Sequence, residues 1–521
     1  MTTIAIQKIN ETHVKLISDE SSIYGSLSEL FAFRVKGYQH QPKYKAGLWD
    51  GFIRLFNAGS KRLPQGLVGK LVKYCKSSDI TILNDGVHIP DPTIDIDVKT
   101  FVESLNLSVK NKVTGNMDKI EIRDYQLDSV LDMIRNQKYL GLSPTSSGKS
   151  LILYMAIRYI QYAYGDKKPI LLLVPSKTLV EQMYSDFEDY SRQDTEWDVS
   201  ENVQKIHGDY SKDIIHSIVV STWQSQIGNV AVVGYFNQFM ALFIDEVHQA
   251  KGKSISSIVE SATHVKYKIG VTGTLSGAYT DEMILTGLFA SPSTVTTTKA
   301  LMDDGKVADL AIKLFQLDYS DDLREQFKLL GPLLKGNKRG PVKYQDEIDY
   351  LCGSIKRNKF LANYSKALSG NTLMLVNKVE THGKVLYEYV TSVLSNTGRN
   401  VYYIDGSVKV KERERIRQIL ETETDAVLVA TYGTLSTGVS IKNLHNVMFC
   451  SPSKSAIRVL QSIGRVLRMS DTKASATLHD FCDNLTGKNK KKNHTMDHAL
   501  ARVMLYAEAQ MNYRILTVPF K

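Results

Sequence analysis

The sequence predicts an α/β protein in which two tandem parallel-sheet domains follow a small α+β domain. The chain has 521 residues, and because single domains usually span ~100–200 residues, about three domains are expected. Short apolar runs alternate with helical segments from residue 139 onward, and this alternation occurs twice. Strands separated by helices form right-handed βαβ units, which build parallel sheets.

The N-terminal part, residues 1 to about 90, has a different pattern. Short β-like runs at 14–17 and 51–56 alternate with turns and with one helical stretch at 69–76, which is typical of a small α+β domain. The next segment, 86–119, carries two prolines, several acids and a polar turn, and we expect a boundary there. The predicted domains are residues 1–95, 96–300 and 301–521.

The two later domains are recognised by their strand-length apolar runs. In the first they are 170–174, 217–220, 241–244 and 268–271, and in the second 372–376, 400–404, 426–430 and 446–450. The charged stretch 318–343 interrupts this rhythm and is interpreted as an interdomain connection. The last domain is expected to finish in a C-terminal helical tail. Binding sites of such sheets lie at the carboxyl ends of the strands.

Composition excludes several classes of protein. The longest apolar runs fall far short of the ~18 residues that span a bilayer, and the N-terminus lacks the basic start and apolar core of a signal peptide. The four cysteines lie far apart, which favours reduced thiols and argues against a zinc site: they are Cys75, Cys352, Cys450 and Cys482. A soluble, cytoplasmic protein without a membrane segment is expected.

Residues 143–150, SPTSSGKS, stand between the apolar stretch 139–142 and the helical pattern 151–164. This context is typical of a phosphate-binding loop, because the unpaired N–H groups and the positive dipole of a helix start hold phosphate oxygens. Lys149 would reach the β- and γ-phosphates of ATP and Ser150 would ligate Mg²⁺. The remaining loop residues expected to bind the nucleotide are Thr145, Ser146, Ser147 and Gly148. Ser143 replaces the first glycine of the strict pattern, so a bland turn is the alternative.

Two acids follow the buried run 239–244. Asp245 can hold the metal, and Glu246 can position or deprotonate the attacking water. Acids also cap helices, but the position after a βαβ strand favours a role in ATP hydrolysis. Upstream of the loop, Gln126 can pair with the edges of adenine while Arg123 or Tyr125 stacks on it or flanks it, although a polar helix start would look the same.

Net charge is +10, from 65 basic and 55 acidic residues. Between Arg34 and Lys76 there are ten basic residues and one acid, Asp50, interleaved with aromatic residues. A solvated face is the bland alternative, but this composition suits a surface that neutralises phosphates and stacks on bases. The candidate nucleic-acid contacts are Lys43, Lys45, Trp49 and Arg54. Trp49 packing the small domain is an equal alternative, and the lysine cluster 488–492 is interpreted as a solvated loop.

The order of the motifs resembles a superfamily 2 helicase of the DExH type. The succession is RDYQ (123–126), PTSSGKS (144–150), VPSKTLVEQ (174–182), STWQS (221–225), DEVH (245–248), TGT (272–274), ATYGTLSTGVSIKNL (430–444) and LQSIGRVLR (460–468). The resemblance implies two RecA-like motor domains and an ATP-driven motor. It also implies that segment 174–182, Thr222, Thr437 and Gly438 follow a nucleic-acid backbone, since hydroxyls and N–H groups bind phosphate without reading sequence.

The last motif has a helical spacing. Gln461, Arg465 and Arg468 fall at i, i+4 and i+7, on one helix face. A lone basic face is usually solvated. Placed across a cleft from Lys149, this face would instead bind ATP and bring two guanidinium groups to the γ-phosphate, so that hydrolysis depends on domain closure.

The N-terminal segments 37–57 and 63–69, GYQHQPKYKAGLWDGFIRLFN and LPQGLVG, resemble a family of recombination helicases of T-even-like phages. The resemblance runs from end to end. It implies activity on branched DNA (forks, four-way junctions, R-loops), on single-stranded DNA and on RNA–DNA hybrids, including fork regression and branch migration. It further implies recombination, replication and repair proteins as partners, in the cytoplasm of an infected host.

Two alternatives remain open at this point. One is an RNA helicase or the motor subunit of a restriction-type enzyme, and the other is a strand-annealing protein whose affinity ATP merely switches. No compact second acidic constellation of the nuclease type occurs in the sequence, which disfavours cutting by this chain itself.

Overall fold

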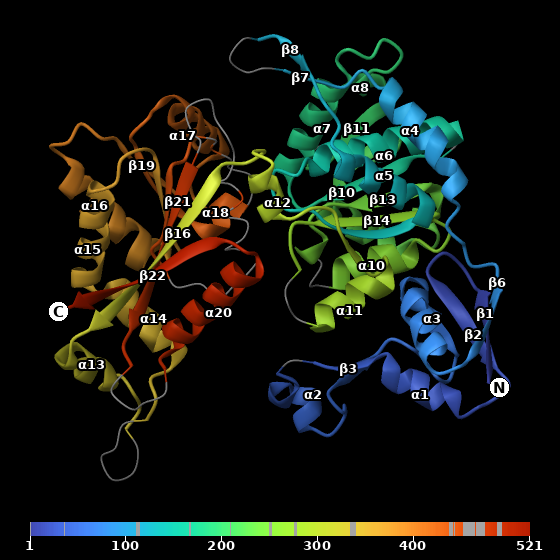
Figure 1. Ribbon diagram of the computed structural model, residues 1–521, viewed down its shortest axis with the longest axis horizontal. Coiled ribbons are helices and arrows are strands. Elements are labelled where there is room, and N and C mark those ends of the chain that lie inside the picture. Colours follow the sequence, from blue (N-terminus) through green and yellow to red (C-terminus); the bar gives the residue numbers. More distant parts are fainter. Residues whose placement is uncertain are drawn as a thin grey trace. The chain divides into compact units, whose positions relative to one another are not determined.

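The computed structural model describes residues 2–521 apart from 36, 111–114, 166–167, 209, 250–252, 276–278, 334–339, 437–440, 442, 452–463, 465–474 and 487–491. The chain forms two compact units, Met1–Thr296 and Thr297–Lys521. Each unit contains a seven-stranded sheet, and both sheets are drawn in Figure 1. Among the described residues, no helix is long and apolar enough to cross a membrane.

The N-terminal module of unit 1 is built on a four-stranded sheet of order β5-β2-β1-β6. β1 pairs antiparallel with β2 and parallel with β6. Alternate residues of β1 and β2, among them Ile4 and Leu16, are fully buried against α1 and α3. The predicted small α+β domain is thereby confirmed. Its elements are β1 (Thr3–Lys8), β2 (His13–Ser18), α1 (Ile23–Leu30), β5 (Arg62–Pro64), α3 (Val68–Ser77) and β6 (Thr81–Asp85).

A separate two-stranded hairpin carries the basic window. β3 (Ala32–Arg34) pairs antiparallel with β4 (Phe52–Arg54). Their connection includes the short helices η1 (Tyr38–His40) and α2 (Pro42–Lys45), and residues 41–48 are all exposed. We call residues 32–54 the basic hairpin. Gly51 adopts a positive φ of 84° beside the Tyr38 ring, where a Cβ would clash.

The large sheet of unit 1 has the order β11-β12-β10-β13-β14-β9-β15, and every pairing is parallel. Its strands are β9 (Lys138–Leu142), β10 (Ile170–Val174), β11 (Val203–Ile206), β12 (Ile218–Thr222), β13 (Ala241–Ile244), β14 (Tyr267–Thr272) and β15 (Pro292–Thr294). Because successive side chains point to opposite faces, Leu172 enters one core and Leu171 and Leu173 the other. Burial on both faces explains the continuous apolar runs.

Helices cover both faces of this sheet (Figure 1). One face packs against α4 (Asp95–Ser104), α5 (Asp124–Asn136), α6 (Lys149–Tyr164) and α7 (Lys177–Ser191), and the other against α10 (Lys253–Ser261) and α11 (Tyr279–Leu288). Shorter elements are the hairpin β7 (Ser108–Lys110) and β8 (Met117–Lys119), α8 (Val199–Asn202) and α9 (Trp223–Gln226).

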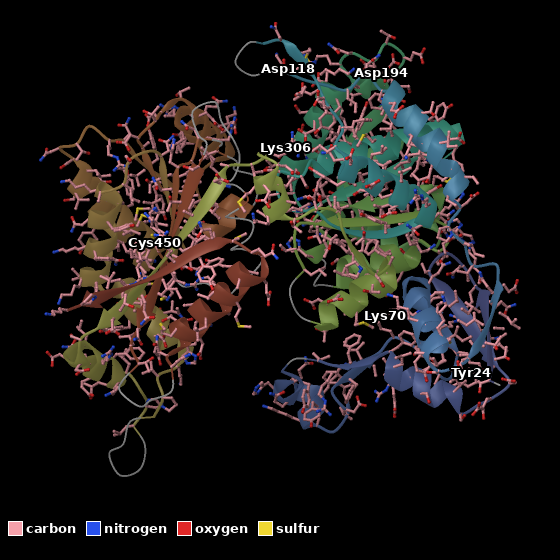
Figure 2. The ribbon with its side chains drawn as sticks, in the orientation of Figure 1. Tyr24, Lys70, Asp118, Asp194, Lys306 and Cys450 are labelled. Atoms are coloured by element: carbon pink, nitrogen blue, oxygen red, sulfur yellow. The ribbon has the colours of Figure 1, made fainter. Side chains whose placement is uncertain are left out.

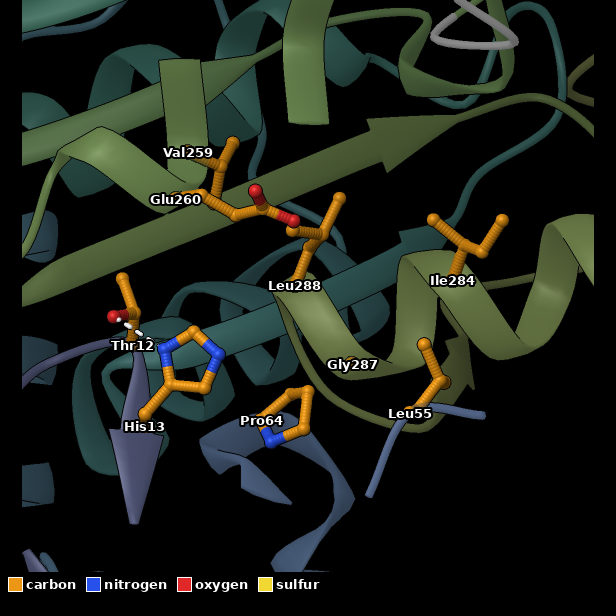
Figure 3. Close-up of a pocket in the computed structure, with 9 residues that line it drawn as sticks. All are labelled: Thr12, His13, Leu55, Pro64, Val259, Glu260, Ile284, Gly287 and Leu288. Carbon is orange, nitrogen blue, oxygen red and sulfur yellow. Dashed lines mark hydrogen bonds between the residues drawn. The ribbon is translucent and has the colours of Figure 1, made fainter. Parts of the chain in front are cut away.

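The N-terminal module joins the large sheet at the amino ends of its strands, away from the phosphate loop. Glu11 pairs with Lys138 at the start of β9 at 2.9 Å, and Lys268 in β14 donates to the Glu11 carbonyl oxygen at 2.9 Å. Met283 of α11 belongs to the module's apolar core, and the Lys70 ammonium lies 2.8 Å from its sulfur; Lys70 is labelled in Figure 2. A small cavity of about 50 Å³ remains between module, α10 and α11 (Figure 3).

Unit 2 repeats the topology of the large sheet in unit 1. Its order is β18-β19-β17-β20-β21-β16-β22, again parallel throughout. Numbered from the first strand of each sheet, both orders read 3-4-2-5-6-1-7. The predicted pair of similar parallel-sheet domains is confirmed. The strands are β16 (Asp309–Tyr319), β17 (Thr372–Val376), β18 (Val401–Ile404), β19 (Val427–Thr431), β20 (Asn446–Phe449), β21 (Ser475–Asn484) and β22 (Asn512–Phe520).

Two expectations for unit 2 are wrong. The stretch 318–343 is no interdomain connection, because it contains the end of β16 and the helix α13 (Asp321–Lys328), and the core includes Phe327. The chain also does not finish in a helical tail, since α20 (His494–Glu508) is followed by β22, which pairs with β16. The charged residues on the exposed face of β16 are the reason that the sequence pattern did not predict this strand. The remaining helices are α12 (Thr298–Asp303), α14 (Tyr344–Gly353), α15 (Ile355–Lys366), α16 (Val385–Leu394), α17 (Val410–Thr422) and α18 (Tyr432–Ser436).

Candidate nucleotide site

The phosphate loop runs from the end of β9 to the start of α6. The Ser143 N–H donates to the Thr272 carbonyl oxygen at 2.8 Å, which ties the loop to β14. The Ser143 and Ser147 hydroxyls lie 2.5 Å apart, and Ser147 donates to the Pro144 carbonyl oxygen at 2.7 Å. Thus the serine in place of the first glycine helps to brace the loop.

Gly148 caps α6 with a positive φ of 84°. A Cβ here would lie 2.3 Å from Gln126 Nε2 and would displace that side chain, and the positive φ itself favours glycine. Ser146 also has a positive φ, of 69°. A non-glycine residue in this region is uncommon and marks a constrained loop.

Lys149 folds over the loop. Its ammonium donates to the Ser143 carbonyl oxygen at 3.0 Å and approaches that of Pro144 at 3.4 Å. The loop N–H groups and this ammonium form a cradle suited to phosphate oxygens. Thr145 lies in the same loop, partly exposed.

Gln126 anchors the loop from α5. Its Oε1 accepts from the Arg123 N–H at 3.0 Å, and its Nε2 donates to the Ser147 carbonyl oxygen at 2.9 Å. Tyr125 donates to the same oxygen at 3.0 Å and accepts from the Arg123 guanidinium at 2.7 Å. Both polar ends of the Gln126 amide are therefore engaged within the chain, and its pairing with adenine stays a prediction.

The acid pair follows β13 at the same sheet edge. The Asp245 N–H donates to the Leu173 carbonyl oxygen at 2.9 Å, and Asp245 accepts from the Glu246 N–H at 2.8 Å. Burial and the adjacent Glu246 raise the pKa of Asp245. Burial opposes the charge on Glu246 too, but Lys149 and His248 outweigh it and lower the pKa of Glu246. Glu246, with φ of 50°, is thus held as a carboxylate beside Lys149.

His248 connects the acid pair to β14. Its Nδ1 lies 2.6 Å from the Thr272 hydroxyl and 3.2 Å from Glu246 Oε2. The Thr272 hydroxyl donates to the Thr274 carbonyl oxygen at 3.0 Å. DEVH and TGT, which lie far apart in the sequence, therefore form one hydrogen-bonded group.

The site fits a nucleotide with a divalent cation. The hydroxyls of Ser146 and Thr274 are buried and make no hydrogen bond within the described chain. Both hydroxyls therefore have unused hydrogen-bonding capacity. The Ser150 hydroxyl lies 2.8 Å from the Tyr190 hydroxyl. A serine hydroxyl and the Asp245 carboxylate are the oxygen donors that Mg²⁺ prefers.

Of the predicted nucleic-acid contacts on the large sheet, Thr222 is 5% exposed and caps α9, accepting from the Ser225 N–H at 3.2 Å. Ser176, in segment 174–182, caps α7 in the same way. Both caps lie at carboxyl ends of strands. Their contact with a nucleic acid stays a prediction.

On the basic hairpin, Lys43 and Lys45 are exposed. Arg54 pairs with Asp50 at 2.6 Å, so part of its charge is compensated. Arg34 lies over the rings of Tyr38 and Phe52, with its guanidinium carbon 4.9 and 4.7 Å from their centroids. Trp49 is half-buried, and its indole N–H donates to the Phe52 carbonyl oxygen at 2.7 Å.

Five predicted site residues lie outside the described part of the chain: Gln461, Arg465, Arg468, Thr437 and Gly438. Most of the lysine cluster 488–492 lies outside it as well. Sequence reasoning missed the hydroxyl of Tyr190 and assigned no contact to His248 or Thr272. Only the motif positions of the last two offered a signal.

Models of three protein families match the chain. The N-terminal domain of the DNA helicase UvsW matches residues 4–85. The res subunit of type III restriction enzymes matches residues 119–277, and the helicase conserved C-terminal domain matches residues 355–470.

The ATP-dependent DNA helicase uvsW of Enterobacteria phage T4 is 33% identical over 97% of this chain and 98% of its own length. The chain belongs to the UvsW family of DNA helicases. The crystal structure of T4 UvsW is 30% identical and covers 100% of both chains, with a TM-score of 0.48. An ATP-dependent type ISP restriction-modification enzyme bound to DNA, LlaBIII, is 14% identical, with a TM-score of 0.55 over 87% of this chain and 34% of its own; that likeness concerns the fold alone.

UvsW-family membership confirms the superfamily 2 class, the two RecA-like domains and the phage-type N-terminal domain expected from the sequence. The enzyme class is that of an ATP-dependent DNA helicase.

Proposed function

We propose that the chain uses ATP hydrolysis to remodel branched DNA: forks, four-way junctions and R-loops. The observation that carries the proposal is the convergence of Lys149, Asp245 and Glu246 at one edge of a parallel sheet, around a loop built for phosphates. We assign residues 1–95 to substrate recognition, and 96–300 and 301–521 to the two motor domains.

In the proposed reaction, Lys149 neutralises the β- and γ-phosphates, and Glu246, held as a carboxylate, orients the attacking water and accepts its proton. Ser150 and Asp245 would hold Mg²⁺, which when bound neutralises charge on the phosphates. Arg465 and Arg468 would stabilise the transition state from the second motor domain, while Gln461 binds ATP.

The basic hairpin is proposed to contact the branch. Lys43 and Lys45 project from its exposed part, and the aromatic groups beside them can stack on unpaired bases. The motor segments (174–182, Thr222, Thr437 and Gly438) would follow the backbone without reading sequence. Recognition of a junction then depends on shape and charge, which accommodates single-stranded DNA and RNA–DNA hybrids as well.

The decisive experiment compares ATP hydrolysis and strand displacement on single-stranded DNA, duplex, fork, four-way junction, RNA–DNA hybrid and single-stranded RNA. Forks and four-way junctions should stimulate hydrolysis most, with ATP-dependent regression or migration of the junction. Strongest stimulation by single-stranded RNA would favour an RNA helicase. ATP-dependent binding without displacement would favour a strand-annealing protein.

A restriction-type motor is the second candidate, since the model of the type III restriction subunit matches the first motor domain. The UvsW N-terminal domain in the same chain favours the recombination role instead. Partners among recombination, replication and repair proteins, and action in the cytoplasm of an infected host, belong to the same proposal.

A further inference from the structure

Tyr190 lies next to the proposed metal ligand although no phosphate-loop motif includes it. Its hydroxyl is 2.8 Å from that of Ser150, and no other hydrogen bond of the Ser150 side chain is seen in the described part of the chain. Ser150 is in the first turn of α6, and Tyr190 is at the end of α7. The two residues are 40 positions apart.

The surroundings hold the Tyr190 ring in place. It packs against the Tyr154 ring at a centroid distance of 5.5 Å. The Tyr154 hydroxyl accepts from Arg158, which also pairs with Asp194 at 2.9 Å, and the Arg158 guanidinium lies 4.2 Å from the Trp197 ring centroid. Asp194 is labelled in Figure 2. A side chain whose rotamer is fixed by packing can orient a ligand, whereas a mobile one cannot.

We infer that Tyr190 is a positioning residue for the metal site, which fixes the Ser150 hydroxyl so that its lone pair faces Mg²⁺. The inference rests on the proposed function, in which Ser150 is a metal ligand. A serine hydroxyl has one proton and two lone pairs. When one lone pair faces a cation, the proton must find an acceptor, and the Tyr190 oxygen is at the right distance to accept it.

A cation polarises the serine hydroxyl and makes it the better donor, so the direction of the hydrogen bond is defined when the site is loaded.

Tyr190 also links the site to the proposed nucleic-acid segment. α7 begins at Lys177, within 174–182, and its 15 residues extend ~22 Å at ~1.5 Å per residue. A displacement of this rigid helix on nucleic-acid binding would move the Tyr190 hydroxyl and with it the acceptor for Ser150.

The test substitutes Tyr190→Phe, which removes only the hydroxyl. Affinity for a fluorescent ADP analogue is measured with and without Mg²⁺, and Mn²⁺ bound with ADP is observed by electron paramagnetic resonance. We expect unchanged affinity without metal and a loss on the order of 10-fold in the enhancement by metal, as found when outer partners of metal ligands are removed. Tyr184→Phe is the matched control, since it removes a tyrosine hydroxyl from the same helix, at a ring that packs against the same core, without touching Ser150.

A double-mutant cycle with Ser150→Ala distinguishes the role of Tyr190 from the role of Ser150 as a metal ligand. If Tyr190 acts through Ser150, then Tyr190→Phe causes no further loss in the Ser150→Ala background. An equal loss in both backgrounds, an equal loss with and without metal, or tighter metal binding in Tyr190→Phe would overturn the inference. A Ser150→Ala variant with normal metal enhancement would contradict the proposed metal site itself.

Discussion

At the residue scale, Lys149 binds the loop's own carbonyl oxygens, a position from which phosphate oxygens can displace them. We predict that Lys149→Ala abolishes turnover, because the phosphate charge loses its nearest cation. Glu246→Gln should bind ATP but not hydrolyse it, since the amide keeps the shape and lacks the base. Steady-state hydrolysis and nucleotide binding check both variants. Hydrolysis at the wild-type rate in either purified protein would contradict the site.

The pKa shifts of Asp245 and Glu246 support the prediction for Glu246→Gln. Lys149 and His248 keep Glu246 ionised despite burial, so it can accept a proton at neutral pH. Asp245, whose pKa burial raises, requires a cation nearby to ionise fully. Two adjacent carboxyl groups with opposite shifts are typical of an acid pair with divided roles.

At the element scale, the basic hairpin is the natural place for branch recognition. Replacing Lys43, Lys45 and Arg54 with Ala should weaken binding to forks and four-way junctions and flatten its dependence on salt. Each lost phosphate contact lowers the log–log slope by roughly 0.9 on duplex DNA. Arg54 should contribute less than the lysines, because Asp50 already pairs with it. Binding titrations at several salt concentrations measure the slope.

Lys99→Ala, an exposed lysine on α4, is the control for this charge change. Basal hydrolysis should survive in all these variants, as the nucleotide loop belongs to another sheet. An unchanged slope after the triple substitution would place recognition elsewhere, with the lysine cluster 488–492 as the next candidate.

Substitution of Trp49 tests the contribution of base stacking on the basic hairpin separately from that of charge. The indole is half-buried and donates to Phe52, so it serves the hairpin as well as presenting a ring. We expect Trp49→Ala to lose about 1–3 kcal/mol of DNA binding, the usual value of one stacked base. Trp49→Phe should retain most of it. Thermal unfolding of Trp49→Ala distinguishes stacking on DNA from a packing role. If Trp49 only packs the hairpin, the melting temperature falls and the folded fraction binds DNA normally.

At the scale of the whole molecule, one prediction concerns the joint between the N-terminal module and the first motor domain. The Glu11 carboxylate accepts hydrogen bonds from Lys8 and Lys138, and the fully buried Lys268 donates to the Glu11 carbonyl oxygen. Glu11→Gln leaves the Lys138 ammonium without its charged, partly exposed partner, and loss of a hydrogen bond between charged groups typically costs ~1–3 kcal/mol. We expect faster hydrogen exchange in α11 and β1, and loss of stimulation by branched DNA while basal hydrolysis persists.

The stability of this joint should depend on pH, because it depends on the charge of Glu11. Burial opposes the charge on Glu11, but Lys138 and Lys8 prevail and lower its pKa. A carboxylate whose folded pKa lies below its unfolded one stabilises fully above the unfolded value, 4.5, and loses this effect as pH falls through the folded pKa. The exposed Asp85→Asn is a control, and exchange equal to wild type in Glu11→Gln would show that the apolar contacts alone hold the joint.

The other whole-molecule prediction requires both units. In Arg468→Ala, and likewise in Arg465→Ala, the rate of ATP hydrolysis should fall by on the order of 10³-fold or more, while the affinity for ATP changes far less. An arginine that reaches the γ-phosphate from another domain acts mainly on the transition state. Single-turnover hydrolysis and nucleotide binding measure the two quantities. Normal hydrolysis in both variants would mean that the predicted helix face is solvated or binds DNA.

The sequence by itself determined the parts of this protein that depend on local chemistry. β10, β13 and β17 match their predicted runs residue for residue, because strands buried on both faces are almost wholly apolar; Thr372 is the one polar residue in these three strands. The loop 143–150 was recognisable because a phosphate cradle is made of neighbouring backbone groups. The motif order was sufficient to predict the helicase class.

Only the tertiary structure decided what depends on partners distant in the sequence. β16 alternates charged and apolar residues and forms a strand because β21 and β22 flank it, and β22 is a strand because it can pair with β16. Tyr190 meets Ser150, and Glu11 meets Lys138 and Lys268, across 40 to 257 positions. Such contacts have no local signature, since burial and pairing energies arise only when the folded chain brings the groups together.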